Sequence, residues 1–407
     1  MIEERIIELN PHWSKKVDWD YPFHRQVFQR IWSDFSAKPM AFLTGPRRTG
    51  KSVILRQLIM QLMEEKVAPT QILFFEFAPR DSLETVNEIW QFFKTVARGT
   101  EKRFAFFDEL QYIDGYESLL KEIYDNNENL KIAVTGSLSL FYKRRMEESL
   151  AGRYFGYRLF PLNFKEYLTL IKSPLANTTL NEKAAIQRAQ VTPLDREFRE
   201  FLSFRRLPET VGLTLEQTKV YVKTIIDQTL TNDAFNYFAI NKPQLILALF
   251  SYIRDNNGGE ISVSNLAESC GANVETVTKY LEILEIMGLV YAISNSPNPI
   301  VKLNSRKKYY VSSHVALLEP KYDFNTALGF AVESYVLEQL LEQGETVTFF
   351  RHRQKEVDFL LPKKKTGFEV KYRLNYDAKD GKVFAPEGFE VKTITALGPL
   401  PACLFLE

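Results

Sequence analysis

The sequence contains little cysteine, no excess of charge of one sign and no long apolar run. Its 407 residues include two cysteines, Cys270 and Cys403, and the formal net charge is +1. Cysteines so far apart in sequence indicate neither a disulfide framework nor a zinc site. A nearly neutral chain has no global field that would recruit nucleic acid or an anionic membrane, so such contacts must come from local patches.

Segments that direct a chain into a membrane are also missing. No apolar run approaches the roughly 20 residues that a membrane-spanning helix needs. The opening MIEERIIELN is charged and acidic, unlike a secretory signal. The sequence therefore predicts a cytoplasmic protein without membrane contact. Its length exceeds that of one ordinary core and predicts about two to four domains.

A phosphate-binding loop in the first quarter carries the strongest functional signal. The segment GPRRTGKS lies between MAFLT, a predicted buried strand, and KSVILRQLIMQLMEEK, a predicted helix. In this spacing the glycines let backbone amides turn toward phosphates, the lysine reaches the β and γ oxygens, and the serine hydroxyl binds Mg²⁺. The helix N-terminus adds further anion-binding amides. We therefore predict ATP and Mg²⁺ as cofactors, bound by Gly45, Pro46, Arg47, Arg48, Thr49, Gly50, Lys51 and Ser52.

A second motif follows further along the chain: the segment KRFAFFDEL predicts a buried strand that ends in two acidic residues. Asp108 is predicted to hold Mg²⁺ through its water shell, and Glu109 to polarise the attacking water as general base. The competing interpretation is an acidic cap on the following helix. The segment QILFFEF lies between the two motifs and predicts an additional strand. That insertion, with a Glu after the Asp, is typical of phosphate-loop proteins that hydrolyse ATP for mechanical work.

Polar and basic residues follow in the positions of a sensor and an arginine finger. LKIAVTGSLSLF predicts a strand ending in Thr135-Gly136-Ser137, where Thr135 or Ser137 would sense the γ-phosphate, unless the segment is a plain turn. An arginine near that phosphate would stabilise the charge that develops in phosphoryl transfer. Arg153, which follows a glycine, is the preferred finger over Arg158; an ordinary surface or ion-paired arginine is the alternative for both.

Together, the phosphate loop, FFDEL, TGS and AGRYFGYRLFPLNFKEYL resemble the prokaryotic AAA-type ATPases that carry a C-terminal domain of unknown function, relatives of the archaeal ATPases. The resemblance covers about residues 20–170. It implies an α/β core with a parallel sheet and ATP bound at the strand tips. It also implies that FLSFRRLPET is a lid segment in which Arg205 or Arg206 contacts phosphate, with surface pairing as the alternative.

The middle of the chain shows the elements of a winged helix-turn-helix in order. PQLILALFSYIRDN, a segment after Ser262 and NVETVTKYLEILEIMG predict three helices, and LVYAISN and RKKYYVSS predict two strands. The third helix has an apolar inward face and a net acidic outward face, which suits a phosphate-lined groove poorly. A protein-docking role therefore competes with nucleic-acid binding through the basic wing. The inward residues are Val274, Val277, Leu281 and Leu284, the outward ones Glu275, Thr276, Lys279, Glu282 and Glu285, and the wing residues Lys302, Arg306, Lys307 and Lys308.

The last quarter resembles the PD-(D/E)XK nuclease fold. Asp358 is followed, after a gap of about ten residues, by Glu369-Val370-Lys371, and Glu333 lies on a predicted helix before them. Paired strands would bring Asp358 and Glu369 onto a Mg²⁺ or Mn²⁺ ion, with Lys371 on the same face beside the attacking water. The resemblance adds Glu333 as a further acidic ligand. The alternative is a Glu–Lys pair on an exposed sheet face, and pairing of Lys371 with Glu369 in the metal position would count against cleavage.

Basic residues near this motif suit a nucleic-acid backbone or simply a solvated hairpin. They are Arg351, Arg353, Lys363, Lys364 and Lys365.

The predicted fold is α/β, a phosphate-loop ATPase sheet followed by a helical and winged-helix middle and a C-terminal α/β nuclease-like domain. We expect an ATPase core over 1–170, a helical lid or connector over 171–240, a winged helix over 241–315 and the nuclease-like domain over 316–407. The predicted function is ATP hydrolysis on or near DNA or RNA by a homo-oligomer, with metal-dependent cleavage by the last domain. The competing interpretations are an ATP-dependent switch with docking modules and no cleavage, and a scaffold with negligible turnover.

Overall fold

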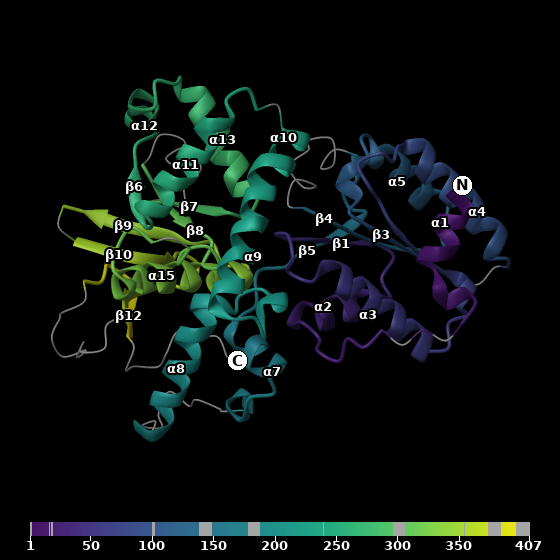
Figure 1. Cartoon of the computed structure of the whole chain (residues 1–407), viewed down its shortest axis with the longest axis horizontal. Helices are drawn as coiled ribbons and strands as arrows, with labels where there is room; N and C mark the ends of the chain where they lie inside the picture. The colour runs from purple at the N-terminus through teal and green to yellow at the C-terminus, as the bar shows by residue number, and fades with distance from the viewer. Residues whose placement is uncertain are drawn as a thin grey trace. The chain divides into compact units, whose positions relative to one another are not determined.

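The computed structural model describes residues 2–15, 17, 19–99, 102–137, 149–177, 188–238, 240–295, 306–318, 320–353, 355–372 and 384–395. The chain divides into two compact units, Met1–Leu159 and Phe160–Glu407, each of mixed α/β type (Figure 1). Among the described residues, no helix is both long and apolar enough to cross a bilayer. The predicted α/β class is confirmed.

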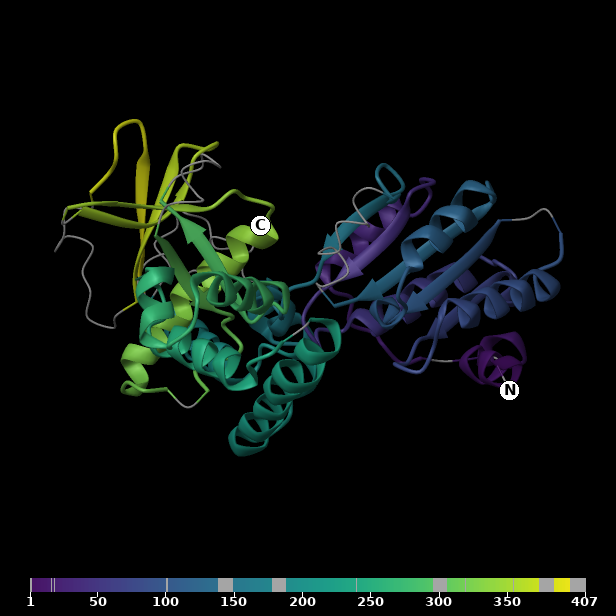
Figure 2. The same cartoon turned by 90° about the horizontal axis from the view of Figure 1, so that it is seen from above.

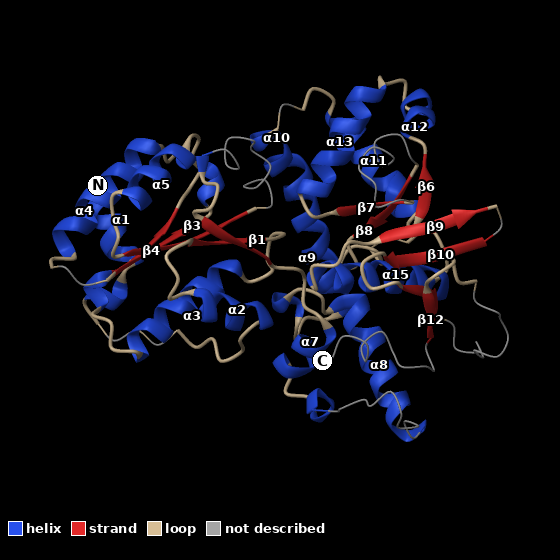
Figure 3. Cartoon of the chain, turned by 180° about the vertical axis from the view of Figure 1, so that it is seen from behind, coloured by secondary structure: helices blue, strands red, loops and turns tan. Residues whose placement is uncertain are grey.

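Unit 1 is built on a five-stranded parallel sheet with the order β2-β3-β4-β1-β5 (Figure 3). Parallel pairing aligns the carboxyl ends of the strands at one edge. The strands are β1 (Met40–Thr44), β2 (Ile72–Glu76), β3 (Arg103–Asp108), β4 (Leu130–Gly136) and β5 (Tyr154–Arg158). The predicted additional strand, β2, therefore forms one end of the sheet, and β4 separates the strand of the phosphate loop from the strand that ends in Asp108.

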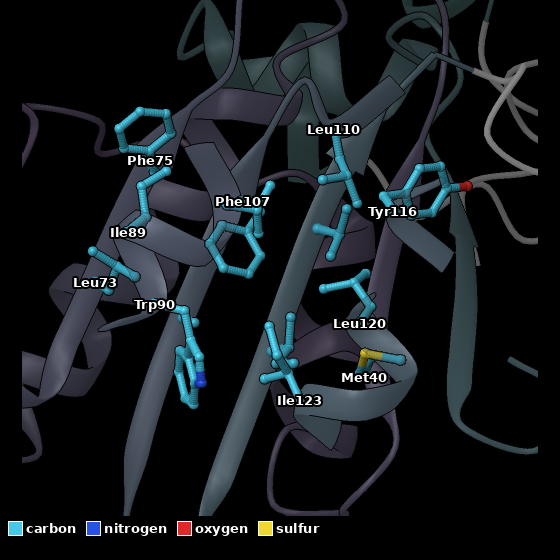
Figure 4. Close-up of a cluster of buried hydrophobic side chains, with 14 of the residues drawn as sticks. Met40, Leu73, Phe75, Ile89, Trp90, Phe107, Leu110, Tyr116, Leu120 and Ile123 are labelled. Atoms are coloured by element: carbon cyan, nitrogen blue, oxygen red, sulfur yellow. The ribbon is translucent and has the colours of Figure 1, made fainter. Parts of the chain in front are cut away.

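Alternating side chains of these strands build a core on each face of the sheet. Met40 and Phe42 of β1 face one cluster with Leu73, Phe75 and Phe107, as Figure 4 shows in part, whereas their neighbours face the other. Apolar residues at both alternating positions are typical of a parallel sheet covered on both sides. Among the described residues, five helices cover the two faces (Figure 3; Figure 2 gives a view turned by 90° from that of Figure 1). They are α1 (Ile2–Leu9), α4 (Leu83–Val96) and α5 (Tyr116–Asp125) on the first face, and α2 (Gln26–Asp34) and α3 (Lys51–Glu64) on the second.

Unit 2 begins at Phe160, inside the range 1–170 that was predicted as the ATPase core. The reason lies in helix α7 (Phe164–Leu170), whose Phe164 packs against Phe198 at 5.2 Å between ring centroids and donates its backbone N–H to the hydroxyl of Tyr335 at 3.1 Å. The aromatic residues of NFKEYL thus belong to the core of the second unit. Two further helices, α8 (Arg188–Phe204) and α9 (Leu215–Gln228), and the short α10 (Ala234–Tyr237) follow.

Three helices and a three-stranded sheet form the next part of unit 2, which we call the β6–β8 module. The helices are α11 (Pro243–Asp255), α12 (Val263–Ser269) and α13 (Val274–Ile286); the strands, in the antiparallel order β6-β8-β7, are β6 (Gly259–Ile261), β7 (Val290–Ser294) and β8 (Lys307–Val311). These match the predicted elements, and β6 is additional. On α13, Val277, Leu281 and Leu284 are buried as predicted, but the inward assignment of Val274 is wrong, because it is 49% exposed in the first turn.

The final part of unit 2 combines a long helix, α15 (Phe324–Glu342), with a four-stranded sheet of order β12-β11-β10-β9. The strands are β9 (Thr348–His352), β10 (Lys355–Leu361), β11 (Thr366–Lys371) and β12 (Glu390–Thr395). Asp358 lies on β10, whereas Glu369 and Lys371 lie on the antiparallel neighbour β11, as the sequence predicts.

Candidate functional site

The phosphate loop joins the carboxyl end of β1 to the first turn of α3. Gly50 has a φ of +98°, and Arg48 has a φ of +62°, so the loop makes its turn through left-handed backbone. Gly45 is required for a different reason: a Cβ there would lie 2.3 Å from the carbonyl oxygen of Leu159. Leu159 follows β5 and donates its N–H to the carbonyl of Thr44 at 2.7 Å. The start of the loop is therefore held against the residue that follows β5.

Two basic side chains brace the loop. The Nζ of Lys51 donates to the carbonyls of Gly45 and Pro46 at 3.1 and 3.0 Å, so it lies folded over the loop. Arg25, which precedes α2 and is 4% exposed, donates from Nη1 to the carbonyl of Thr49 at 2.8 Å. Sequence reasoning missed Arg25, since a lone arginine before a helix carries no motif.

Asp108 lies at the tip of β3 and is fully buried. Burial raises its pKa to about 6; the neighbouring charge of Glu109 adds to the rise, and the nearby hydroxyls of Ser52 and Thr135 oppose it. Its Oδ1 accepts a hydrogen bond from the Thr135 hydroxyl, whereas Oδ2 has no hydrogen-bond partner among the described residues. A buried carboxylate oxygen without a partner is costly, and beside a serine hydroxyl it offers the hard oxygen donors that Mg²⁺ prefers. The residues present therefore fit Mg²⁺ at this position.

Glu109 is held beside Asp108 by two residues. Its backbone N–H donates to Thr135 Oγ1 at 3.1 Å, and its carboxylate accepts a hydrogen bond from Gln111 Nε2. Gln111 in turn accepts from the backbone N–H of Ser137 at 3.1 Å. Gln111 therefore connects the tip of β3 to the tip of β4. Sequence reasoning missed it, although its position two residues after Glu109, in DELQ, was a usable signal.

The two candidate arginines lie at opposite edges of the sheet. Tyr154 pairs with Met40 and Arg158 with Thr44, so Arg158 lies at the edge of the phosphate loop and Arg153 precedes the far end of β5. Arg153 instead makes a two-pronged ion pair with Asp125, at 2.9 and 3.0 Å. Because a strand advances about 3.3 Å per residue, Arg153 lies too far away to reach a phosphate bound to the same molecule. The preference for Arg153 over Arg158 within one chain is therefore not supported by the geometry.

Unit 2 contains the second group of predicted site residues. We call Glu333, Glu356, Asp358 and Glu369 the acidic cluster. Asp358 Oδ2 accepts the backbone N–H of Val370 at 2.9 Å, and Lys371 Nζ lies 2.7 Å from Glu369 Oε1. Burial raises the pKa of Asp358 and of Glu369. Lys371 is therefore paired with Glu369, the arrangement that we expected to count against metal-dependent cleavage of nucleic acid.

Lys308 also belongs to this site, contrary to its predicted place on a basic wing. Its side chain is 3% exposed; the ammonium contacts the carboxylate of Glu356 and lies 3.6 Å from Asp358 Oδ1. Of the other wing residues, Arg306 is exposed, Lys307 is half-buried and Lys302 lies outside the described residues. Arg351 likewise is ion-paired, with Glu260 of β6 at 3.1 Å.

Glu333 projects from α15 toward the same cluster. Burial raises its pKa to about 8, and the charge of Asp358 adds to the rise. Glu333 and Lys371 also line a cavity of about 650 Å³ together with Arg199, Phe330 and Tyr372. In the described part of the chain, no three acidic, histidine or cysteine side chains converge in a way that could hold a metal ion. The acidic cluster is balanced by lysines, and as it stands it does not fit a divalent metal.

Neither predicted lid arginine is arranged as a free phosphate contact. Arg206 is 2% exposed and lies 2.5 Å from Glu338 Oε2, within unit 2. Its Nε donates to Ser313 Oγ at 2.8 Å, and Ser312 Oγ donates to the other oxygen of Glu338 at 2.5 Å. Arg205 donates to the carbonyl of Thr210 at 2.6 Å. Both arginines are thus ion-paired, the alternative to phosphate contact given above: Arg205 with Glu200 and Arg206 with Glu338. The Arg206 pair is buried rather than at the surface.

Three family models match successive parts of the chain. Residues 37–168 match the family described as "AAA domain". Residues 195–314 and 328–392 match two families described as domains of unknown function, DUF8612 and DUF4143. The first match lies over the parallel sheet and the phosphate loop, so this part of the chain is similar to that family.

The chain is similar to curated proteins over most of its length. It is 23% identical over 331 residues to an uncharacterized protein of Haemophilus influenzae, covering 79% of each chain. It is 24% identical over 355 residues to an uncharacterized protein of Methanocaldococcus jannaschii, covering 84% of this chain and 77% of the other. Among solved structures, the Walker-type ATPase of Pyrococcus abyssi matches with a TM-score of 0.46 and 17% identity, covering 77% of this chain and 97% of the other.

Proposed function

We propose that the protein binds and hydrolyses ATP at the carboxyl edge of the five-stranded sheet. The observation that carries this proposal is the arrangement around Asp108: a buried carboxylate with one unpartnered oxygen, adjoining Glu109 and next to Ser52 of the phosphate loop. A structural acidic cap would be solvated and would need no hydroxyl groups aimed at it. The arrangement instead suits a cation and a water molecule at a nucleotide.

In this proposal each residue has a separate task. The backbone N–H groups of the loop from Gly45 to Ser52, except at Pro46, which has none, bind the phosphates together with the ammonium of Lys51. For this, Lys51 exchanges its contacts with the Gly45 and Pro46 carbonyls. Ser52 and Asp108 would hold Mg²⁺, which when bound neutralises phosphate charge. Glu109 accepts the proton of the attacking water, and Gln111 fixes its orientation. Thr135 senses the γ-phosphate from the tip of β4.

Nucleotide binding and phosphate release by the purified full-length chain test this proposal. Lys51→Ala should weaken ATP binding and reduce turnover by about 10²-fold or more, because the lysine contacts charge that develops in the transition state. Lys94→Ala, an exposed lysine of α4, is the matched control and should change neither quantity. Parent-like binding and turnover in Lys51→Ala would reject the proposed site.

For unit 2 we propose a docking role driven by the ATP cycle rather than strand cleavage. Two observations support it: lysines balance the acidic cluster, and the exposed face of α13 carries Glu275 and Glu282. An acidic face disfavours a groove lined with phosphates. Metal-dependent cleavage by Asp358, Glu369, Glu333 and Lys371 stays a prediction. Degradation of labelled DNA or RNA by the parent chain with Mn²⁺, absent in Asp358→Asn, would establish cleavage and refute the docking proposal.

Nucleic-acid contact is a second candidate because Lys363, Lys364 and Lys365 form an exposed turn between β10 and β11. Such contact would be made with the backbone and would not depend on sequence. Replacing all three lysines by Gln should then weaken binding similarly for different sequences, and should reduce the slope of log affinity against log salt by about 0.9 for each lost duplex contact. An unchanged salt slope would remove this turn from consideration.

A further inference from the structure

The acidic cluster receives a cation from a different part of unit 2. Lys308 lies on β8 of the β6–β8 module, whereas Glu356 and Asp358 lie on β10 of the four-stranded sheet. The lysine side chain is 3% exposed, so its charge is removed from water together with the carboxylates. A buried ammonium is costly unless it is paired, and here two carboxylates lie beside it. The module and the sheet therefore hold each other through this contact.

The surroundings of Lys308 are packed closely enough to fix its position. Its Nζ lies 5.4 Å from the centroid of the Phe349 ring, and Tyr310, two residues further along β8, packs on Phe359 at 5.5 Å between ring centroids. A Cβ at Gly258 would lie 2.9 Å from Glu333 Oε2, so this turn of the module touches the fourth member of the cluster as well.

A second set of contacts joins the same two parts. Arg351 of β9 lies 3.1 Å from Glu260 of β6, and the side-chain oxygen and nitrogen of Asn295 pair with the Arg351 backbone, each at 3.2 Å. Asn257, before β6, donates to the carbonyl of Phe330 and to Ser334 of α15, both at 3.0 Å. The module thus covers the cluster through several independent interactions rather than one ion pair.

We propose that Lys308 occupies the place of a divalent cation in the acidic cluster, so that the docked β6–β8 module keeps this cluster free of metal. The same carboxylate oxygens that contact the ammonium would be the ligands of a hard divalent ion such as Mn²⁺. Both cations cannot share them, because a unit charge a few ångströms from the metal opposes its binding. This proposal concerns unit 2 and does not depend on ATP hydrolysis in unit 1.

Counting bound Mn²⁺ tests the proposal. The electron paramagnetic resonance signal of free Mn²⁺ is titrated against the full-length chain without nucleotide, for the parent, Lys308→Met and Lys307→Met. We expect Lys308→Met to bind one additional Mn²⁺ per chain, about tenfold or more tighter than the parent binds at this cluster. Lys307→Met, which changes the preceding residue of the same strand, should match the parent. Any Mn²⁺ bound at the nucleotide site is present in the parent and in both variants, so it does not contribute to the difference between them.

A second substitution locates the new ion. Lys308→Met combined with Asp358→Asn should lose the additional Mn²⁺. If Lys308→Met fails to fold, Lys308→Met combined with Glu356→Gln removes both members of the closest ion pair and leaves Asp358 and Glu369 as ligands. Equal Mn²⁺ binding by the parent and the folded Lys308 variant would overturn the proposal. So would a Mn²⁺ site in the parent that Asp358→Asn alone abolishes.

Discussion

Gln111 Nε2 donates a hydrogen bond to the carboxylate of Glu109, and Gln111 Oε1 accepts the backbone N–H of Ser137 at the tip of β4. The proposed general base is therefore oriented by a side chain that also contacts the strand of the proposed sensor. A base that must lie within about 3 Å of its proton depends on such positioning.

Removing the Gln111 amide should lower turnover more than substrate affinity. Gln111→Ala leaves Glu109 chemically intact but free to rotate, and a misplacement of about 1 Å can cost roughly 10²-fold in rate. We expect kcat to fall by about ten- to a hundredfold, with KM for ATP changed by about twofold or less. Gln91→Ala, on the exposed face of α4, is the control. A rise in KM at constant kcat would show that Gln111 binds substrate instead.

The Thr135 hydroxyl serves Asp108 and Glu109 at once, because it donates to the first and accepts from the second. Thr135→Val should leave both groups without this partner, at a stability cost of about 1–3 kcal/mol, and should lower kcat. Thr135→Ser retains the hydroxyl and should restore most of the activity. Thermal unfolding and steady-state turnover of the two variants check this, and equal activity of both would contradict it.

Substitution of Arg158, the last residue of β5, and of Arg153, which precedes β5, should affect ATP turnover differently. Arg158→Ala should reduce kcat by roughly 10²-fold if Arg158 neutralises charge at the phosphates. Arg153→Ala should leave kcat of a dilute sample within about twofold, since Arg153 lies at the opposite edge of the sheet. Turnover measured over a range of protein concentrations separates action within a chain from action across subunits. Loss of activity in Arg153→Ala only at concentrations where the chain self-associates would indicate action across subunits.

Acid should weaken unit 2 through His314, which lies beside the Arg206–Glu338 pair. Burial lowers the pKa of His314 from 6.5 to about 4. Because the folded pKa is below the unfolded one, the unfolded chain binds the extra proton, and stability falls as pH falls from 6.5 toward 4. His314→Gln should lose less stability over this interval. Urea unfolding at pH 7 and pH 5 measures the difference, and parallel losses in parent and variant would contradict the assignment.

The sequence predicted unit 1 well because its motifs are local. GPRRTGKS and FFDEL each combine a strand, a turn and chemistry-bearing residues in a few positions, so reading them requires no knowledge of distant contacts. Gln111 and Arg25 were not predicted, because their roles depend on contacts with residues that are distant in sequence, Ser137 at the tip of β4 and Thr49 in the phosphate loop. Which of Arg153 and Arg158 lies at the phosphate edge within one chain depends on strand direction, which the glycine before Arg153 does not indicate.

Unit 2 was predicted less completely because its decisive contacts join residues far apart in sequence. The alternation in KEVD and EVK located two paired strands correctly. No local pattern indicated that Lys308, in the basic run RKKYY, turns inward to Asp358, 50 positions later in the chain. Arg206 and Glu338 form a buried pair over an even longer separation. Charge patterns alone predict exposed lysines and arginines, and tertiary packing overrides them.

Glu109 is proposed to activate water for ATP hydrolysis at the tip of β3, and this role is measured by the turnover of Glu109→Gln. The variant and the parent are compared under saturating ATP and Mg²⁺, with nucleotide binding measured on the same samples. We predict that Glu109→Gln binds ATP like the parent but hydrolyses it about 10²–10⁴-fold more slowly, the range expected for removal of a positioned base. Hydrolysis by Glu109→Gln at the parent rate would contradict the account.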